Sequence, residues 1–378
     1  MANKMTKVLH VILDMKYGGM QRLLLALLPN LDRERFEVEV LVLDPESPLL
    51  ERVGTEFPVH VMGRMGPTSM LRPRALARRI AAVSPDIVHT HSGTWYKVSL
   101  AARMAGVRSI VYTDHGRQYP DPRFGRFLDF LASRRSTEIV AVSETVRAQL
   151  SRFVARPEDI SVILNGVDCD TFCPGNTTSE GKGELGLPED SLILGSIGRL
   201  EPIKGYDIMI DAFGELRTAL PDGEMPVLVI VGDGSESESL RKRVAGLGLE
   251  GRVLFFGWRD DIQRLLRAFD VFSLSSRSEG SSLSLLEAMS SGVCPVVTDV
   301  GGNSAILGPE LAHRTVPPNE PVPLAGAWLR AIKDAASRKK DARTARDRVL
   351  SKFSLTAMAG AYEDLYATCG RDGSVAFP

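Results

Sequence analysis

The stretch SRSEGSSLSLLEAMSSGVCPVVTDVGG, residues 276–302, carries the clearest local signal in the sequence. It follows the strand-like run DVFSL, and after a loop rich in serine and glycine it opens a segment of helical character. The β-branched run CPVVTD then predicts a second strand. A strand, a small-residue loop, a helix and another strand in this order are typical of a doubly wound α/β fold.

The same alternation extends in both directions along the chain. Helix-length amphipathic segments such as QRLLLALLPNL separate runs that are apolar throughout. Continuous apolar runs indicate strands buried on both faces, so we expect parallel sheets covered by helices. The other expected strands are KVLHVIL, VEVLVL, DIVHTH, SIVYTDH, EIVAVS and ISVILNG, followed after residue 188 by LILGSIG, VLVIVGD and VLFFG.

The length of 378 residues and a break in the alternation predict two Rossmann-like domains facing each other across a cleft. The break, Cys169 to Pro188, is rich in Gly, Pro, Ser and Thr and is typical of a linker. We therefore expect an N-terminal domain at 1–175 and a C-terminal domain at 189–354. A C-terminal helix and tail, 355–378, is expected to pack back toward the N-terminal domain through Leu355, Met358, Tyr362, Leu365 and Tyr366.

Composition argues against several classes of protein. Lys+Arg 46 against Asp+Glu 47 gives no basic excess, so we expect no nucleic-acid partner. No run approaches the roughly 20 apolar residues of a membrane span, and the first apolar run has the character of a strand, so we expect a cytoplasmic protein. The four cysteines have no metal-binding spacing.

Two loops carry residues suited to a phosphorylated ligand. If a helix begins near Ser281 or Ser282, its free N–H groups form an anion site, with Glu287 placed to bind a ribose and Glu279 to bind sugar hydroxyls. The alternative is a capped helix on which Glu287 is solvated. In GSIGRLEPIKGYD, Arg199 and Lys204 suit a pyrophosphate, although cations on a loop are often only solvated charges.

Together with VGDGS at 231–235 and FFGW at 255–258, these two loops resemble the C-terminal domain of family 4 glycosyltransferases (glycosyl transferases group 1), enzymes of GT-B fold. The resemblance implies that Arg199 and Lys204 hold the donor diphosphate, that Glu287 binds the ribose and that Glu279 contacts the transferred sugar. The loop that would present backbone amides to the phosphates is Gly280, Ser281, Ser282 and Leu283. At two places the sequence departs from the family's frequent pattern. Ser281 and Ser282 stand where the family often has Phe-Gly, and Asn-Ser-Ala after Gly302 stands where it often has Pro-Glu.

The N-terminal half carries weaker marks of the same family. Gly18 and Gly19 in KYGGMQR correspond to a glycine pair near the donor or acceptor, and His115 resembles the family's cleft histidine that faces the donor sugar. His89 and His91 fall on one face of a strand, which suits either a metal or a structural role; we favour the structural one. The D-x-D pair of Asp168 and Asp170 is assigned to turn structure, and we expect no metal site.

The resemblance implies a retaining glycosyltransferase that uses a UDP- or GDP-sugar, without a metal or other cofactor, and a glycan or lipid-linked acceptor of surface polysaccharide synthesis. A sugar-nucleotide epimerase and a non-catalytic sugar-nucleotide-binding protein are the alternatives. The segment 119–135 mixes arginine with aromatic residues, which suits peripheral contact with the inner face of a membrane or simply a helix with a basic face. Arg72, Arg74, Arg78 and Arg79 add to this basic character.

Overall fold

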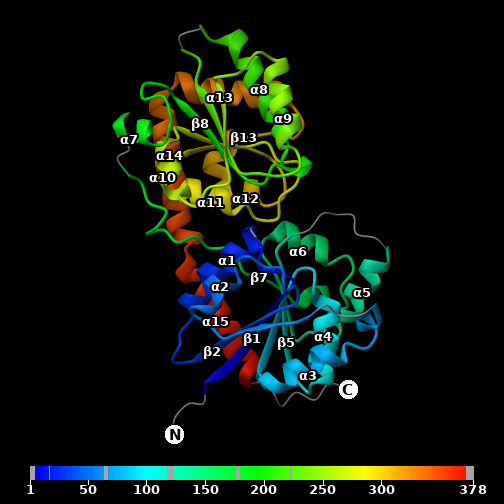
Figure 1. Ribbon diagram of the computed structural model, residues 1–378. Helices are drawn as coiled ribbons and strands as arrows, with labels where there is room; N and C mark the ends of the chain where they lie inside the picture. Colours follow the sequence, from blue (N-terminus) through cyan, green and yellow to red (C-terminus); the bar gives the residue numbers. More distant parts are fainter. Residues whose placement is uncertain are drawn as a thin grey trace. The chain divides into compact units, whose positions relative to one another are not determined.

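The chain divides into two units, each a parallel sheet with helices on both faces (Figure 1). The computed structural model describes residues 5–16, 18–63, 67–116, 123–175, 179–221 and 224–371. One unit comprises Met1–Gly166 and Leu355–Pro378, and the other comprises Val167–Ser354. The C-terminal helix therefore belongs to the first unit, as the sequence predicted.

The first unit holds a sheet in the order β3-β2-β1-β4-β5-β6-β7, with every pairing parallel. Its strands are β1 (Thr6–Ile12), β2 (Phe36–Val42), β3 (Val59–Val61), β4 (Ile87–His91), β5 (Ser109–Asp114), β6 (Glu138–Ala141) and β7 (Ile160–Val162). Its helices are α1 (Gly19–Leu27), α2 (Leu50–Gly54), α3 (Arg74–Val83), α4 (Trp95–Met104), α5 (Arg123–Ser133), α6 (Glu144–Leu150) and α15 (Leu355–Arg371).

The second unit holds a parallel sheet in the order β10-β9-β8-β11-β12-β13. Its strands are β8 (Ile193–Ile197), β9 (Val227–Val231), β10 (Val253–Gly257), β11 (Val271–Leu274), β12 (Cys294–Thr298) and β13 (Thr315–Val316). Its helices are α7 (Ser179–Glu184), α8 (Tyr206–Ala219), α9 (Ser237–Gly246), α10 (Ile262–Ala268), α11 (Leu283–Ser290), α12 (Asn303–Leu307), α13 (Pro321–Lys333) and α14 (Ala335–Lys352).

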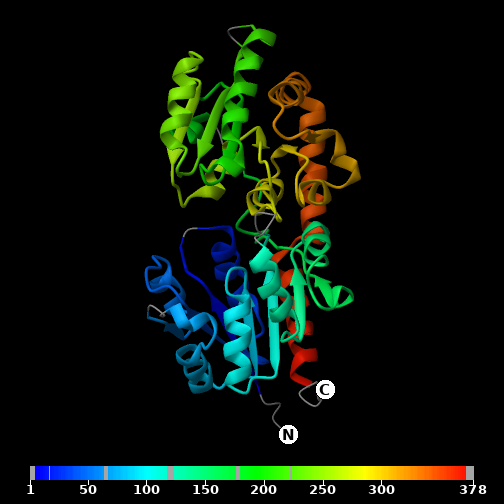
Figure 2. The same cartoon turned by 90° about the vertical axis from the view of Figure 1, so that its right-hand side faces the viewer.

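The two faces of the first sheet are covered differently. Leu76 and Ile80 of α3 and Val98 of α4 pack on one face against strand residues such as Leu9. Helix α15 (red) runs along the other face, against β1 and β4 (Figure 2). Because side chains alternate along a strand, His10 of β1 lies on this second face, under α15.

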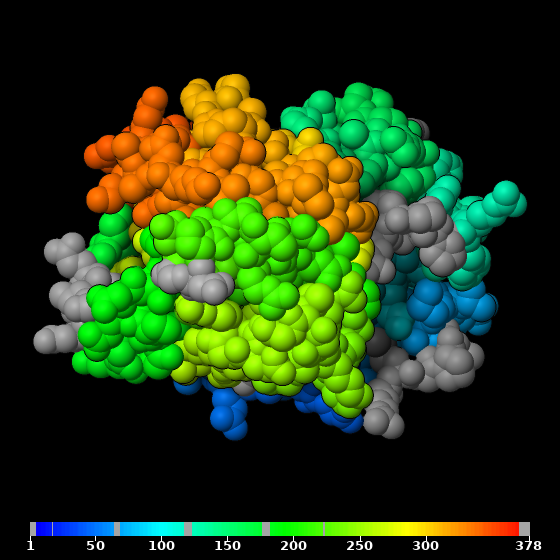
Figure 3. Space-filling view, turned by 90° about the horizontal axis from the view of Figure 1, so that it is seen from above, coloured from blue at the N-terminus to red at the C-terminus, as the bar shows by residue number. Residues whose placement is uncertain are grey.

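The second sheet is enclosed in the same way. On its outer surface α8 lies between α9 and α13 (Figure 3, green between yellow-green and orange). Trp328 of α13 and Phe213 of α8 are fully buried there. On the other face, Leu265 of α10, Leu286 of α11 and Val349 of α14 share a core with the strands.

The segment expected to link the domains is part of the second unit. The N–H of Val167 donates to the carbonyl oxygen of Phe353 at 2.9 Å, and Val167 pairs with Ser354. Leu185 and Leu187 are buried in the core of that unit. These scattered apolar side chains anchor a segment whose glycine and proline content alone predicts a free linker.

Both sheets have a topological switch point, the place where the strand order reverses. In the first sheet it lies between β1 and β4, and in the second between β8 and β11. Ligands of open α/β sheets bind outside the carboxyl ends of the strands at such points. Among the described residues, no helix has the length and apolar character that crossing a membrane requires.

Candidate active site

The loops that follow β8 and β11 meet through an ion pair at the switch point of the second unit. The Nζ atom of Lys204 lies 2.6 Å from Oε1 of Glu279, and the hydroxyl of Ser276 donates to the same oxygen at 2.6 Å. The side chains of Lys204 and Glu279 are 20% and 8% exposed, so the pair is largely screened from water. Two of the predicted site residues are thus brought together.

Two glycines allow these loops to touch. Gly205 has a φ of 64°, and a Cβ atom there would overlap the carbonyl oxygen of Ser275. Gly301, with a φ of 57°, leaves no room for a Cβ atom beside the carbonyl oxygen of Glu279. Both positions need the left-handed conformation that glycine adopts without strain. The backbone of the loop after β11 is therefore approached closely at Ser275 and at Glu279, each time by a loop that only glycine permits.

Helix α11 begins at the predicted place. Ser282 is its N-cap, and the Ser282 hydroxyl accepts from the N–H of Leu285 at 3.4 Å. The helix therefore directs its N-terminal dipole and free N–H groups at the end of the loop 280–282. Glu287, over a turn further on, is only 5% exposed. The alternative in which Glu287 is a solvated helix residue is wrong, because packing in the core around α11 buries it.

Arg199 stands apart from this cluster. It follows Gly198 directly after β8, and its side chain is exposed. Its carbonyl oxygen accepts from the N–H of Glu201 at 2.8 Å, but its guanidinium forms no hydrogen bond or ion pair with a described residue. A cation in this state is available to a ligand.

Arg277 is a residue that sequence analysis missed. Its guanidinium lies 2.6 Å from a carboxylate oxygen of Asp207 and donates to Asn319 at 2.8 Å and to the carbonyl oxygen of Pro202. It therefore fastens the loop after β11 to the start of α8. Its position in SRSE beside Glu279 was the signal available in the sequence.

In the first unit, Gly18 and Gly19 lie at the start of α1, which follows β1 at the switch point. Gly18 is the N-cap of that helix, in an extended conformation that does not require glycine. A Cβ atom at Gly18 would meet the flexible end of Gln21 at 2.5 Å. No ligand role is decided by this geometry, so the predicted role of the pair stays a prediction.

His115 follows β5 and is joined to a cluster of buried histidines. Its Nε2 atom lies 3.0 Å from Nδ1 of His91, and Nδ1 of His10 lies 3.2 Å from Nε2 of His91. Burial lowers the pKa of His115 to about 4 and that of His10 to about 3. These imidazoles are therefore neutral at pH 7. His10 escaped the sequence analysis because it lies inside an ordinary apolar strand.

The cluster also meets a first condition for a metal site. Atoms of His10, His89 and His91 that could act as ligands all lie within 4.8 Å of one another. The rings are, however, already hydrogen-bonded to one another and to hydroxyl groups, as described below.

The D-x-D pair of Asp168 and Asp170 forms a turn. Asp168 accepts from the N–H groups of Asp170 and Thr171 at 3.0 and 3.1 Å and so closes this turn.

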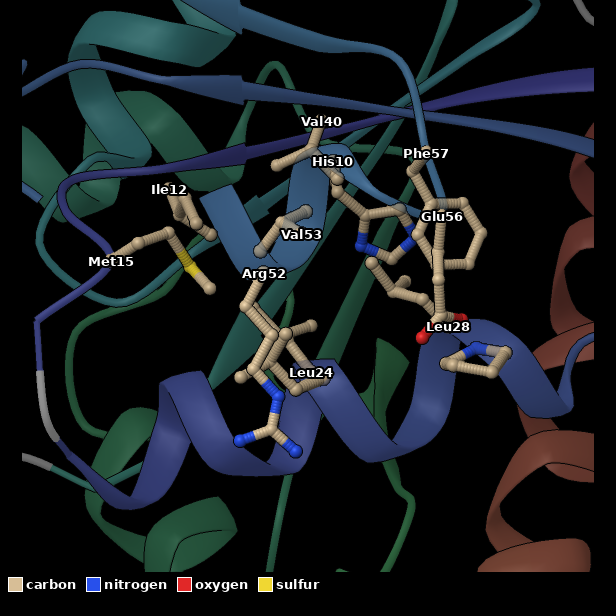
Figure 4. A pocket seen from close by; sticks show the side chains of 12 residues that line it. His10, Ile12, Met15, Leu24, Leu28, Val40, Arg52, Val53, Glu56 and Phe57 are labelled. Carbon is tan, nitrogen blue, oxygen red and sulfur yellow. The ribbon is translucent and has the colours of Figure 1, made fainter. Parts of the chain in front are cut away.

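A small pocket lies between α1, α2 and the first sheet (Figure 4). Leu24 of α1 and Leu28, which directly follows that helix, face Val40 and Val53 across it, and His10 forms part of its wall. Its lining is mostly apolar and contains none of the residues predicted to bind the donor.

Comparison with known families decides what the two units are. The family model described as Glycosyltransferase Family 4 matches residues 17–171, and the model described as Glycosyl transferases group 1 matches residues 178–348. The chain belongs to the family 4 glycosyltransferases. The expected family and the enzyme class are thereby confirmed.

Relatives of this glycosyltransferase match it over nearly its whole length. The UDP-Gal:alpha-D-GlcNAc-diphosphoundecaprenol alpha-1,3-galactosyltransferase of Escherichia coli is 29% identical, with 95% of this chain and 96% of that protein covered. The putative glycosyltransferase EpsF of Bacillus subtilis is 26% identical, with 97% of each chain covered. Both names describe transfer, which favours a transferase over the epimerase alternative.

Solved structures confirm the GT-B fold. Anabaena HepE, crystallised with UDP and glucose, superposes on this glycosyltransferase with a TM-score of 0.84 at 22% identity, covering 96% of this chain and 100% of that one. The same protein was also solved with UDP-glucose, at a TM-score of 0.82 and 23% identity. At these identities the likeness concerns the fold alone.

Proposed function

We propose that this glycosyltransferase takes a sugar from a nucleoside diphosphate sugar and transfers it, with retention of anomeric configuration, to a hydroxyl group of a glycan or lipid-linked acceptor. The observation that carries the donor assignment is the ion pair of Lys204 and Glu279 at the switch point of the second unit. Glu279, the acidic member of the pair, lies in the loop that leads into the capped start of α11.

Each part of the donor has a matching group. Cations and a helix N-terminus favour anions, so this end of the site binds the diphosphate. The groups that bind it are Lys204, the exposed Arg199 and the amides of Gly280, Ser281, Ser282 and Leu283. The buried carboxylate of Glu287 binds the ribose, and Glu279 binds the transferred sugar. UDP is the favoured nucleotide, because the HepE structures hold UDP and UDP-glucose.

The proposed chemistry follows from these charges. The bond between the anomeric carbon and the diphosphate oxygen breaks as the acceptor oxygen bonds to that carbon from the same face, and a donor phosphate oxygen takes the acceptor's proton. Negative charge grows on the leaving diphosphate, where Lys204 and the helix amides stabilise it. We assign His115 a part in the transfer step, and we expect no metal ion to be needed.

A lipid-linked acceptor is supported by one relative and one surface. The name of the E. coli relative specifies a diphosphoundecaprenol acceptor. On α5, Phe124, Phe127 and Phe130 are 69%, 55% and 37% exposed and, three residues apart, share one face beside Arg123 and Arg126. We propose that this face rests on the cytoplasmic surface of a membrane. Residues 119–122 of the segment singled out from the sequence lie outside the described residues.

A panel of UDP- and GDP-sugars in a thermal-shift assay tests the donor site. The cognate donor raises the melting temperature of the wild type, and this shift is expected to vanish in Glu287→Ala and Lys204→Ala. Lys242→Ala is a matched control, because Lys242 forms an ion pair of the same 2.6 Å length with Glu238 on the exposed face of α9. A shift that survives both site variants, or the absence of any shift, would refute the assignment.

A further inference from the structure

A continuous chain of hydrogen bonds runs through the buried face of the first sheet, from helix α15 to His115. Register brings its members together: His10 of β1 pairs with His89 of β4, and His91 of β4 pairs with Thr113 of β5. Tyr362 and Tyr366 of α15 are 1% and 0% exposed and close the chain from above. The proposed transfer mechanism uses none of these groups except His115.

Each link joins one donor to one acceptor. The Nε2 atom of His115 lies 3.0 Å from Nδ1 of His91, and Nε2 of His91 lies 3.2 Å from Nδ1 of His10. The hydroxyl of Tyr366 lies 3.4 Å from Nε2 of His10 and 2.6 Å from Nδ1 of His89. Thr113 then joins Nε2 of His89, at 2.8 Å, to the hydroxyl of Tyr362, at 3.1 Å.

This arrangement couples the proton positions of the histidines. Burial keeps the four imidazoles neutral, so each carries one N–H and one bare nitrogen. Every histidine-to-histidine link joins an Nδ1 atom to an Nε2 atom. If two neighbouring histidines carried their protons on different nitrogens, the two linked atoms would be either two N–H groups or two lone pairs, and no hydrogen bond could form between them. His10, His91 and His115 must therefore share one tautomer.

The far end of the chain decides which tautomer that is. The hydroxyl of Tyr362 has Thr113 as its sole hydrogen-bond partner among the described residues. If the chain ran toward Tyr362, the Tyr362 hydrogen would be buried without an acceptor, which costs about 1–3 kcal/mol. In the opposite direction, Tyr362 donates to Thr113, Thr113 to His89, His89 to Tyr366 and Tyr366 to His10. Each imidazole then carries its proton on Nδ1. The one donor without a partner among the described residues is Nδ1–H of His115, a partly exposed residue where a bound group can accept from it, whereas Tyr362 is 1% exposed.

We propose that Tyr366 and the buried histidine chain fix the proton of His115 on its Nδ1 atom, making His115 a hydrogen-bond donor at that atom. The Nδ1 atom is buried and has no partner among the described residues, so it is free to donate to a bound group. Tyr366 is thus a positioning residue that acts through His10 and His91. Its relevance to sugar transfer rests on the proposed function, but the position of the proton does not.

A metal ion is the competing use of His10, His89 and His91. Both ring nitrogens of each of these histidines already have a hydrogen-bond partner. An ion would have to displace several of these links at once. The bonded chain accounts for the cluster without an ion, and metal binding becomes an outcome of the test.

Nitrogen-15 NMR of the full chain with labelled histidine reads the tautomers directly. The six histidines can be assigned one by one with His→Gln variants. We expect His10, His89, His91 and His115 all to carry their protons on Nδ1. In Tyr366→Phe the chain is cut, so His10, His91 and His115 are expected to become mixtures of both tautomers. His60 and His313, which bond to Glu39 and Asp341, report whether the fold is intact.

Tyr362→Phe is the matched control, since it removes a buried hydroxyl from the same helix one turn away. In this variant Thr113 becomes the end of the chain, and of its two partners in the chain only Nε2 of His89 remains. Its hydroxyl must therefore still donate to His89, so the tautomers should stay as in the wild type. Neighbouring histidines of opposite tautomer, a proton on Nε2 of His115, or an unchanged spectrum in Tyr366→Phe would each overturn the proposal. So would Zn²⁺ that moves the signals of His10, His89 and His91. The wild-type spectrum decides the matter alone if Tyr366→Phe fails to fold.

Discussion

Nζ of Lys204 lies 2.6 Å from Oε1 of Glu279, across 75 residues of sequence. One residue follows β8 and the other follows β11, so the ion pair spans the switch point of the second sheet. In the absence of a ligand, Glu279 holds the ammonium group in place. A bound diphosphate would then meet a cation whose position is already fixed, which is the condition under which charge stabilises a transition state most strongly.

Lys204→Ala is expected to lower kcat about 100- to 1,000-fold, because one fixed donor to the leaving group is lost. The melting temperature should change little by comparison. Steady-state kinetics on the purified variant measures this effect. Lys242→Ala, with its exposed ion pair to Glu238, should retain wild-type turnover. Equal losses in the two variants would show that Lys204 has no special role.

Gly301→Ala is expected to destabilise the second unit by more than about 1 kcal/mol, since alanine resists a φ of 57° and its Cβ atom would overlap the carbonyl oxygen of Glu279. Urea denaturation measures the free energy of unfolding. Gly246→Ala is the control: no atom lies within 4 Å of a Cβ atom at that position, so its stability should equal or exceed the wild type. A stable, active Gly301→Ala protein would contradict the packing described for the Glu279 loop.

Retention and metal independence can be measured in one reaction. The anomeric coupling constant of the product, followed by proton NMR from the start of the reaction, should match the configuration of the donor. Addition of EDTA should leave the initial rate unchanged, because Lys204 and the α11 amides are proposed to carry the charge that a metal otherwise neutralises. An inverted product, or a rate restored only by Mg²⁺ or Mn²⁺, would refute this part of the mechanism.

Acid should destabilise the first unit. Burial lowers the folded-state pKa of His10 to about 3 and that of His115 to about 4, below the ordinary value of 6.5. The unfolded chain therefore binds more protons, and stability is complete above about pH 6.5 and falls below it. For each additional proton that the unfolded chain binds, the free energy of unfolding falls by about 1.4 kcal/mol per pH unit. Denaturation curves from pH 7.5 to pH 4.5 test this, and a flat profile would contradict it.

The aromatic face of α5 can be tested with vesicles rich in phosphatidylglycerol at low salt. A Phe124→Ser, Phe127→Ser double variant is expected to bind at least about tenfold more weakly, since each buried phenyl ring contributes about 1.5–3 kcal/mol. Trp258→Ser removes an aromatic side chain of similar exposure, 54%, from the second unit and should leave vesicle binding unchanged. Wild-type protein that does not sediment with the vesicles would exclude the proposed membrane contact.

Much of this arrangement follows from local sequence, and the rest depends on register. The loops of Lys204 and Glu279 could be placed at one sheet edge because each follows an apolar run. Their ion pair could not, since it depends on how the strands are ordered. His10 shows the same limit: the run KVLHVIL predicts a buried strand, but only pairing with β4 sets His10 beside His89. Strands of two or three residues, such as β13 and β3, are too short to give a periodic signal.

The assignment of Leu355–Pro378 to the first unit has a consequence for how the chain is made. A ribosome releases the strands of that unit, then the whole of Val167–Ser354, and only then α15. At ordinary rates of translation, about tens of seconds pass between the synthesis of His89 and that of Tyr366, its hydrogen-bond partner. During that interval the nascent sheet lacks the part of its cover that α15 provides over the face that carries His10, and the second unit can complete its own core first. Chains truncated before Leu355 would therefore be held in a state prone to aggregation and recognised by chaperones.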